Sequence, residues 1–367
     1  MKDTLTQSLF VDIFSTPHLL EQFNLKQWEQ LLRILRGADM LGSFYYFLDK
    51  NAQLSNVPDF AIAHLRSAKR YSDRQVQQIS AETDILQQTL QTVDCRPIFL
   101  KGAAYVLNKS SNHLGRVMTD IDILVPKADL ESVENALKLD GWIEKVLDDY
   151  DQQYYRKWAH ELPPFTHPER GATLDVHHTI IPPISGITVP ESFLFNENIV
   201  LEDGKETLSE SMVILHCLVH LFYNEDYEKS FRDILDIHLL LLDYERNEDI
   251  SQICVLARNL GFNKEFYYAC SITDQLFRTQ RVAAVNSCIT PFIDTRLTNF
   301  FIRNIILAAL IPSHDLLDKR WNKLARYIMF LRGHFLKMPL GVLVPHFWVK
   351  SRRALVMLVM GPHHYEK

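Results

Sequence analysis

The chain has 367 residues, of which 47% are hydrophobic and 23% are charged, and its formal net charge is −6 at pH 7. This composition excludes collagen-like chains, low-complexity disordered chains and small disulfide-rich proteins. The net charge gives no sign of a general nucleic-acid-binding protein, and the length predicts about two domains.

The first 94 residues have the periodicity of helices. In the clearest stretch, side chains recur in steps of three and four residues, which places them on one face of a long helix. This helix is predicted to end near Asp94, before Pro97. Its face is formed by Val76, Ile79, Thr83, Leu86, Leu90 and Val93.

Residues 95–205 have a different pattern, in which short apolar runs alternate with helical stretches. Proline, glycine and charged turn residues separate these runs and indicate where strands and helices end. The pattern predicts strands at 98–100, 121–125 and 142–147, helices from 103 and over 130–140, and hairpin arms at 158–166 and 172–179.

From Ser209 the helical period returns, with Ser209 as the expected N-cap of the first helix. Further helices are predicted at 231–242, 250–260, 265–277 and 297–310. The whole pattern predicts an α+β fold, with a mixed β-sheet and its helices embedded in N- and C-terminal helical regions. We divide the chain into an N-terminal helical region (1–94), a core (95–205), a C-terminal helical domain (206–318) and a basic, aromatic tail (319–367).

Three acidic residues occupy positions that neighbouring strands would bring together. Asp120 and Asp122 alternate with isoleucines, so they point to one face of a strand while the isoleucines point to the buried face. Asp175 and His177 share a face of a later strand by the same rule. Three close carboxylates are costly unless a cation fills the site. Oxygen ligands suit Mg²⁺, which also binds substrate phosphates, so we predict a metal site at the three acids.

The Lys101-Gly102 turn is a candidate phosphate site. A glycine lets the backbone approach a phosphate, and the N-terminus of the following helix presents free N–H groups. Lys101 would add a point charge, and Arg116 is a candidate for a bidentate clamp on a triphosphate. With the acids, this pattern favours metal-assisted phosphoryl or nucleotidyl transfer. The alternatives are a simple turn glycine and solvated loop positions for Lys101 and Arg116.

The segments FLKGAAYVL, DIDILVPKADLE and LDVHH, in that order, resemble an uncharacterised bacterial nucleotidyltransferase family built around LKG-x-A and D-[IL]-D-[IL]-L-V. More broadly, they resemble the nucleotidyltransferase superfamily of DNA polymerase β. The resemblance covers about residues 75–245 and includes the helical stretch ILHCLVHLF…FRDILDIHLLL. It implies that residues 95–205 form a minimal nucleotidyltransferase core.

The resemblance also implies a role for each matching residue. Asp120 and Asp122 match the pair that binds two Mg²⁺ ions, and Asp175 matches the third acid, which bridges a metal ion and the attacking hydroxyl. Gly102 and Ala103 match the turn that holds the nucleotide phosphates, although Ala103 replaces the Ser of that turn. The implied reaction transfers a nucleoside monophosphate from a nucleoside triphosphate to an acceptor and releases pyrophosphate.

Several other polar residues have both a functional and a structural interpretation. His177 is a candidate to orient Asp175 or the nucleophile, or it is a hydrogen-bonded hairpin histidine. His216 and His220 have the i, i+4 spacing of zinc ligands on a helix, but their apolar neighbours favour core packing. On a later helix, the i, i+4 spacing favours a structural ion pair between Arg232 and Asp236.

The tail carries a charge of +9, which leaves −15 on residues 1–318. Its aromatic residues interleave with Lys and Arg, which is typical of segments that bind anionic surfaces. Gly333, Pro339, Gly341 and Pro345 predict breaks in its helical pattern. Three interpretations stay open for residues 319–353, namely docking on the acidic body, peripheral membrane association, and binding of RNA or another anionic partner.

The five cysteines are scattered and include no Cys-x-x-Cys pair, so neither a zinc site nor a disulfide framework is predicted. A reducing, cytoplasmic compartment suits this pattern, and the N-terminal segment has acidic residues where a signal peptide needs an apolar run. The apolar stretches near Leu340–Val349 and Ala354–Met360 are too short and interrupted to span a bilayer.

Two other functions stay open beside nucleotidyl transfer. Ala103 and the long gap between Gly102 and Asp120 favour a non-catalytic nucleotide-binding or scaffolding module, for instance in polysaccharide production. The large helical flanks also permit a nucleotidyl-transferring toxin or a modifier of protein or tRNA. The sequence indicates neither the acceptor nor the base preference.

Overall fold

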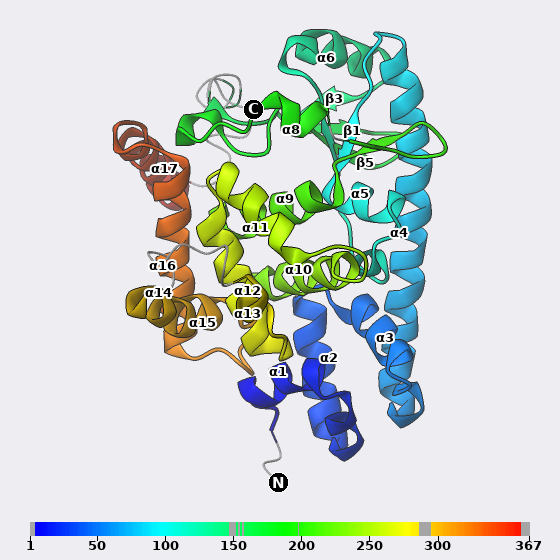
Figure 1. Ribbon diagram of the computed structural model, residues 1–367, viewed down its shortest axis with the longest axis vertical. Helices are drawn as coiled ribbons and strands as arrows, with labels where there is room; N and C mark the ends of the chain where they lie inside the picture. The colour runs from blue at the N-terminus through cyan, green and yellow to red at the C-terminus, as the bar shows by residue number, and fades with distance from the viewer. Residues whose placement is uncertain are drawn as a thin grey trace.

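The structure is a computed structural model that describes residues 4–146, 152, 155, 158–196, 198–285 and 295–360. A mixed sheet and the helix α6 lie at one end of the molecule, and the N-terminal helices lie at the other (Figure 1). This arrangement confirms the predicted α+β class with helical regions around a sheet.

The long helix α4 joins the two ends of the molecule along one side (Figure 1). It has 33 residues, Asp59–Gln91, and it follows α1 (Gln7–Ser15), α2 (Leu25–Gly37) and α3 (Leu41–Lys50). The predicted helix over residues 76–93 is therefore the second half of a longer element. Its buried face packs on the sheet through Ile79, Leu86 and Leu90.

Seven strands form the sheet in the order β3-β4-β5-β2-β1-β7-β6. In the centre, β2 runs parallel to β5 and antiparallel to β1. The strands are β1 (Ile98–Leu100), β2 (Ile121–Leu124), β3 (Ile143–Glu144), β4 (Phe165–His167), β5 (Ala172–His177), β6 (Ile199–Val200) and β7 (Glu206–Thr207). The register places Asp122 of β2 opposite Asp175 of β5.

Among the described residues, the α-helices between these strands are α5 (Lys101–Leu107), α6 (Leu130–Leu139) and α8 (Glu191–Phe195). The first begins at Lys101, two residues before the predicted start at Ala103. Gly141 follows α6 with a φ of +98°, a backbone conformation that glycine adopts without strain.

The first helices after the sheet lie in the centre of the molecule in Figure 1, and the last two lie at its left side. They are α9 (Glu210–Tyr223), α10 (Ser230–Tyr244), α11 (Ile250–Asn259), α12 (Asn263–Phe277), α13 (Arg281–Val285), α14 (Arg296–Phe301), a π-helical turn (Ile302–Ile306) and α15 (Leu307–Leu310). Each predicted helix from Ser209 to residue 310 corresponds to one or more of these elements.

The N-terminal and C-terminal helices share one hydrophobic core. The ring of Phe231 in α10 lies 5.1 Å from that of Phe10 and 5.3 Å from that of Phe14, both in α1. A second core lies between the sheet, α4, α5 and α6. Residues of the regions 1–94 and 206–318 therefore stabilise each other. The division of the chain into four parts stays a proposal.

The predicted tail forms α16 (Arg320–Lys337) and α17 (Leu340–Met360), with a break at Met338 and Pro339. The expected breaks at Gly333, Gly341 and Pro345 are wrong, because all three residues lie inside helices. At Gly333, the missing side chain lets α16 approach α9, since a Cβ atom there would lie 2.7 Å from the Asn224 carbonyl oxygen. Pro345 removes one amide donor, which a helix of 21 residues tolerates.

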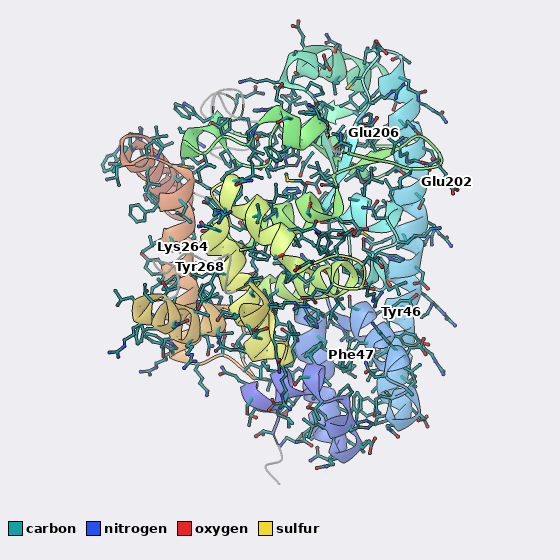
Figure 2. All side chains as sticks on the ribbon, in the orientation of Figure 1. Tyr46, Phe47, Glu202, Glu206, Lys264 and Tyr268 are labelled. Carbon is teal, nitrogen blue, oxygen red and sulfur yellow. The ribbon has the colours of Figure 1, made fainter. Side chains whose placement is uncertain are left out.

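The helix α16 packs on the body of the protein, as the docking interpretation of the tail expected. Arg332 pairs with Glu265 at 3.3 Å, and Lys337 pairs with Glu225. The Arg332 guanidinium also lies 5.8 Å from the ring centre of Tyr268 on α12, a residue labelled in Figure 2.

Within the described part of the chain, no individual helix has the length and apolar character needed to cross a membrane. The segments Arg320–Lys337 and Leu340–Arg353 meet that criterion only when they are joined, and they are bent by 118°.

A close backbone contact fixes the loop before β2. A Cβ atom on Gly42 of α3 would lie 2.4 Å from the carbonyl oxygen of Gly115, whose φ is +76°. A few residues later, the side-chain amide of Gln75 donates to the Met118 carbonyl at 2.6 Å and accepts from its amide at 3.2 Å. The helices α3 and α4 therefore hold the segment that leads into Asp120 and Asp122.

We expect Gly42→Ala to lower the free energy of unfolding by about 1–3 kcal/mol, because a new methyl group would collide with backbone atoms. Urea unfolding measures this change. Gly37→Ala is the control, since its Cβ would meet only the His314 ring at 3.8 Å and alanine is favoured in a helix by about 1 kcal/mol. Equal stability of the two variants would contradict the importance of the contact.

Candidate functional site

The central strands bring the three predicted acids together. Asp120 immediately precedes β2, Asp122 lies within it, and Asp175 lies opposite Asp122 on β5. One carboxylate oxygen of each residue lies within 4.8 Å of those of the other two. Asp122 is only 2% exposed, whereas Asp120 and Asp175 are partly exposed. These three residues offer only oxygen ligands, the donor set that Mg²⁺ prefers.

Asp122 already has two hydrogen-bonding partners. Lys101 Nζ donates to Asp122 Oδ1 at 2.6 Å, and His177 Nε2 lies 3.0 Å from the same oxygen. Burial by itself raises the pKa of Asp122, but Lys101 and His177 outweigh burial and hold this pKa well below its ordinary value. Asp122 is therefore ionised at neutral pH.

The side chain of Lys101 contacts a carboxylate within the protein, whereas the sequence predicted a contact with a phosphate. Its backbone has a φ of +43°, and it follows Leu100, which pairs with Asp122 across the β1–β2 ladder. Its side chain therefore reaches the Asp122 carboxylate. On β5, His177 lies two positions after Asp175, the residue that pairs with Asp122 on β2. His177 is therefore a diagonal neighbour of Asp122, and its ring contacts the Asp122 carboxylate.

The surroundings of Asp175 raise its pKa, whereas those of Asp122 lower it. Burial, followed by the negative charges of Asp122 and Glu161, raises its pKa from 3.8 to about 7. Its Oδ1 atom is buried and has no hydrogen-bond partner. An unpartnered carboxylate oxygen beside two other acids fits a site that takes a cation or a proton.

A cavity of about 290 Å³ opens in front of these residues. One wall contains Lys101, Asp120 and Asp175, and the opposite wall comes from α9 and α16. The remaining lining residues are His160, Glu161, Ile180, Ile181, Pro182, His216, Val219, His220, Tyr223, Asn224 and Lys337. Asp120 also borders a second cavity of about 260 Å³ beside α4. Asp120 and Asp175 are therefore accessible to a small ligand, whereas Asp122 lines neither cavity.

The Gly102–Ala103 part of the predicted phosphate turn lies inside the protein. Both residues are buried, and a Cβ atom on Gly102 would lie 3.0 Å from the Met118 side chain. Neither residue borders the 290 Å³ cavity. The missing side chain at Gly102 thus serves the packing of α5 against the loop before β2.

Arg116 is not brought to the acids. Its Nε donates to Asp236 on α10 at 2.7 Å, and its guanidinium lies over the Tyr105 ring at 5.5 Å. It lines neither of the two cavities. The predicted pair of Arg232 and Asp236 is also wrong, since Asp236 pairs with Arg116 and Arg232 pairs with Asp233 at 3.2 Å.

Sequence reasoning missed much of the cavity wall. His160 and Glu161 lie in the predicted hairpin arm at 158–166, but no motif marked them as functional residues. His216 and His220 had a recognisable spacing, and the core-packing interpretation was incomplete because both line the cavity. His216 is nevertheless only 5% exposed. Lys337 was counted only as part of a basic tail.

A family model described as an uncharacterised nucleotidyltransferase matches residues 24–278. This match covers more than half of the chain and includes α2 to α4, the sheet, and α9 to α12. Comparison with curated proteins and with solved structures gave no match.

The raised pKa of Asp175 predicts how stability depends on pH. An unfolded chain ionises this group near 3.8, whereas the folded protein ionises it near 7. The folded state therefore loses stability from this group as the pH rises from about 4 to about 7. Removing the charge with Asp175→Asn should raise the stability of the metal-free protein relative to wild type, and by roughly 1–3 kcal/mol more at pH 8 than at pH 5.

Urea unfolding in the presence of a chelator at the two pH values measures this difference. Glu131→Gln is the matched control, because it removes one carboxylate from the exposed face of α6. A stability difference between Asp175→Asn and wild type that does not change with pH would contradict the assignment.

Proposed function

Since the chain belongs to this family of uncharacterised nucleotidyltransferases, we propose that it transfers a nucleoside monophosphate from a nucleoside triphosphate to an acceptor hydroxyl. Mg²⁺ is the proposed cofactor, because the three acids offer only oxygen ligands, which suit Mg²⁺ better than ions that prefer nitrogen or sulfur. The observation that carries this proposal is the group formed by Asp120, Asp122 and Asp175 at the edge of a cavity.

 We propose that two Mg²⁺ ions bind, which is the number that the family resemblance implies for acids at Asp120 and Asp122.

The donor set fits such ions. All three residues offer carboxylate oxygens, and Asp175 Oδ1 is buried without a partner. When bound, Mg²⁺ neutralises charge on the triphosphate and lowers the pKa of the acceptor hydroxyl. Lys101 and His177 hold Asp122 in place and keep it ionised, and the ionised form of a carboxylate is the form that binds a cation.

Asp175 is the proposed general base, because cation binding uses one of its carboxylate oxygens and leaves the other to accept a proton. In the proposed step, the acceptor oxygen forms a bond to the α-phosphorus, and its proton passes to an Asp175 oxygen. The bond between the α-phosphorus and the bridging oxygen breaks at the same centre. Pyrophosphate leaves with the electron pair of that bond.

The triphosphate is proposed to lie in the 290 Å³ cavity, where Lys101 and Lys337 supply positive charge. The backbone of Gly102 and Ala103 stays a proposed phosphate contact, although both side-chain positions are packed inside the protein. Arg116 stays a proposed contact only if it leaves Asp236, with which it forms an ion pair at 2.7 Å.

We expect Mg²⁺-dependent binding of a nucleoside triphosphate to wild-type protein, and at least about 100-fold weaker binding to Asp120→Asn, because one cation ligand is lost. Calorimetric titration with each of the four common triphosphates measures the affinity. Glu131→Gln is the control for the lost charge. Equal affinity in wild type and Asp120→Asn, or affinity that does not depend on Mg²⁺, would contradict the assignment.

The second candidate is a non-catalytic nucleotide-binding or scaffolding module, as considered for polysaccharide production. The specific observation in its favour is that Lys101 and His177 already neutralise Asp122. Release of pyrophosphate from a labelled triphosphate, with a cell extract as the source of acceptor, separates the two functions. The catalytic proposal expects release by wild type and none by Asp120→Asn.

The outer face of α16 and α17 is proposed to bind an anionic membrane surface from the cytoplasmic side. Exposed aromatic and aliphatic side chains lie on these helices next to exposed basic ones, a combination typical of interfacial helices. The apolar members are Trp321, Tyr327, Phe335, Leu340, Val344 and Trp348, and the basic members are Lys319, Arg320, Lys323 and Arg352.

Sedimentation with lipid vesicles tests this surface. The protein is expected to sediment with vesicles that contain anionic phospholipid and to stay in solution with neutral vesicles, because basic side chains supply about 1 kcal/mol each near an anionic surface. Sedimentation that is absent with both kinds of vesicle, or equal with both, would contradict the proposal.

A further inference from the structure

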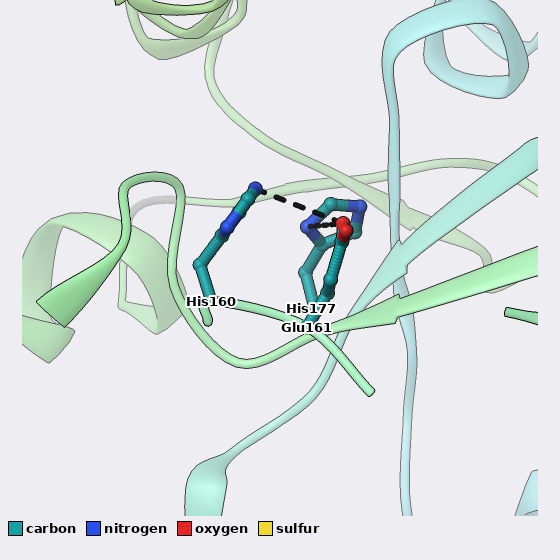
Figure 3. A group of neighbouring side chains, drawn as sticks. All are labelled: His160, Glu161 and His177. Atoms are coloured by element: carbon teal, nitrogen blue, oxygen red, sulfur yellow. Dashed lines mark ion pairs between the residues drawn. The ribbon is translucent and has the colours of Figure 1, made fainter. Parts of the chain in front are cut away.

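Two histidines and a glutamate form a second group of metal-binding side chains beside the three acids. His160 and Glu161 precede the sheet strand β4, and His177 ends β5 (Figure 3). An isolated bridge between Glu161 and His177 holds the two backbone segments together. His160 and Glu161 line the 290 Å³ cavity, so the group lies at the cavity wall.

Two distances within this group are close to those of a tetrahedral metal site. Glu161 Oε2 lies 3.4 Å from His177 Nδ1 and 3.7 Å from His160 Nε2. One ligand atom of each residue lies within 4.8 Å of those of the other two. Two ligands at 2.0–2.1 Å from a tetrahedral Zn²⁺ ion are separated by about 3.4 Å. Small side-chain movements would therefore bring all three atoms to one ion.

His177 has an unused ligand atom at the centre of the group. Its side chain is 0% exposed, and its Nδ1 atom has no hydrogen-bond partner. The nearest carboxylate oxygen, Glu161 Oε2, lies 3.4 Å from Nδ1, which is an ion-pair distance. The other ring nitrogen, Nε2, lies 3.0 Å from Asp122 Oδ1. Metal-binding histidines commonly donate their second N–H to a carboxylate in this way, which fixes the ring and its tautomer.

His160 brings a second ring nitrogen to this group. Its Nε2 atom lies 3.7 Å from Glu161 Oε2. Its ring centre lies 5.1 Å from that of His177. Both rings are therefore positioned on one side of Glu161.

We propose that His160, Glu161 and His177 bind a transition-metal ion of the Zn²⁺ class, with the fourth coordination position facing the cavity. Two imidazole nitrogens and one carboxylate oxygen suit such an ion, whereas Mg²⁺ favours oxygen ligands. Three protein ligands with an open fourth position are typical of zinc sites that bind a water molecule or a substrate group. Asp122 orients His177 and thereby links this site to the three acids.

The competing occupant of the group is a proton. In that case His177 is an imidazolium ion between Asp122 and Glu161, and the three residues form an ion-pair chain without metal. Zn²⁺ binding requires the unprotonated Nδ1 atom, so it would release a proton from any imidazolium that is present. The two occupants therefore differ in metal stoichiometry, which can be measured directly.

The test is equilibrium dialysis of the chelator-treated, full-length protein against Zn²⁺, without nucleotide or Mg²⁺, followed by elemental analysis. We expect one Zn²⁺ ion per chain in wild type, and at least tenfold weaker binding in His160→Ala and in Glu161→Gln. Cobalt substitution should give wild type the visible absorption of a four-coordinate Co²⁺ ion. Thermal unfolding checks that each variant is folded.

Two control variants separate this site from its surroundings. His220→Gln removes another histidine of the same cavity, and Asp120→Asn removes one of the three acids; both are expected to retain Zn²⁺ binding. Wild-type affinity in His160→Ala or Glu161→Gln would overturn the proposal, as would an equal loss in His220→Gln. Because no nucleotide is present, the outcome does not depend on whether the proposed nucleotidyl transfer is correct.

Discussion

The buried carboxylate of Asp122 is the group around which the centre of this protein is organised. A charged carboxylate in the interior is costly unless hydrogen bonds and opposite charges compensate it. Lys101, which follows β1, and His177, which ends β5, both supply that compensation from the strands on either side of β2. His177 lies on the same strand as Asp175, and its other ring nitrogen lies 3.4 Å from Glu161 Oε2. One buried charge therefore links three strands, the three acids and the His160–Glu161–His177 group.

The helices supply the wall that faces these strands. The helix α9 presents His216 and His220 to the cavity, and α16 adds Lys337. The helix α16 can come this close because Gly333 has no side chain beside the Asn224 carbonyl, and because Arg332 pairs with Glu265. Residues that are far apart in the sequence therefore enclose one cavity. The basic tail is in part a component of that cavity rather than a separate feature.

The parts of this arrangement that follow from local periodicity could be predicted from the sequence. The alternation around Asp120 and Asp122, and the later Asp175, predicted three acids on neighbouring strands, and the parallel β2–β5 register places them together. Contacts set by tertiary packing could not be predicted in this way. Arg116 and Asp236 are separated by 120 residues, and His160 and Glu161 meet His177 only through the folding of the chain. Glycine at 333 predicted a helix break but instead permits a close helix contact, because propensity is weaker than packing.

The most direct test of the central claim is a crystal structure of the protein with a non-hydrolysable nucleoside triphosphate and Mn²⁺ in place of Mg²⁺. Anomalous diffraction would locate the ions independently of the rest of the density. The account predicts Mn²⁺ bound by Asp120, Asp122 and Asp175, with the triphosphate in the cavity between these acids and α9. A nucleotide bound elsewhere, or acids that bind no Mn²⁺ while the nucleotide is present, would contradict it.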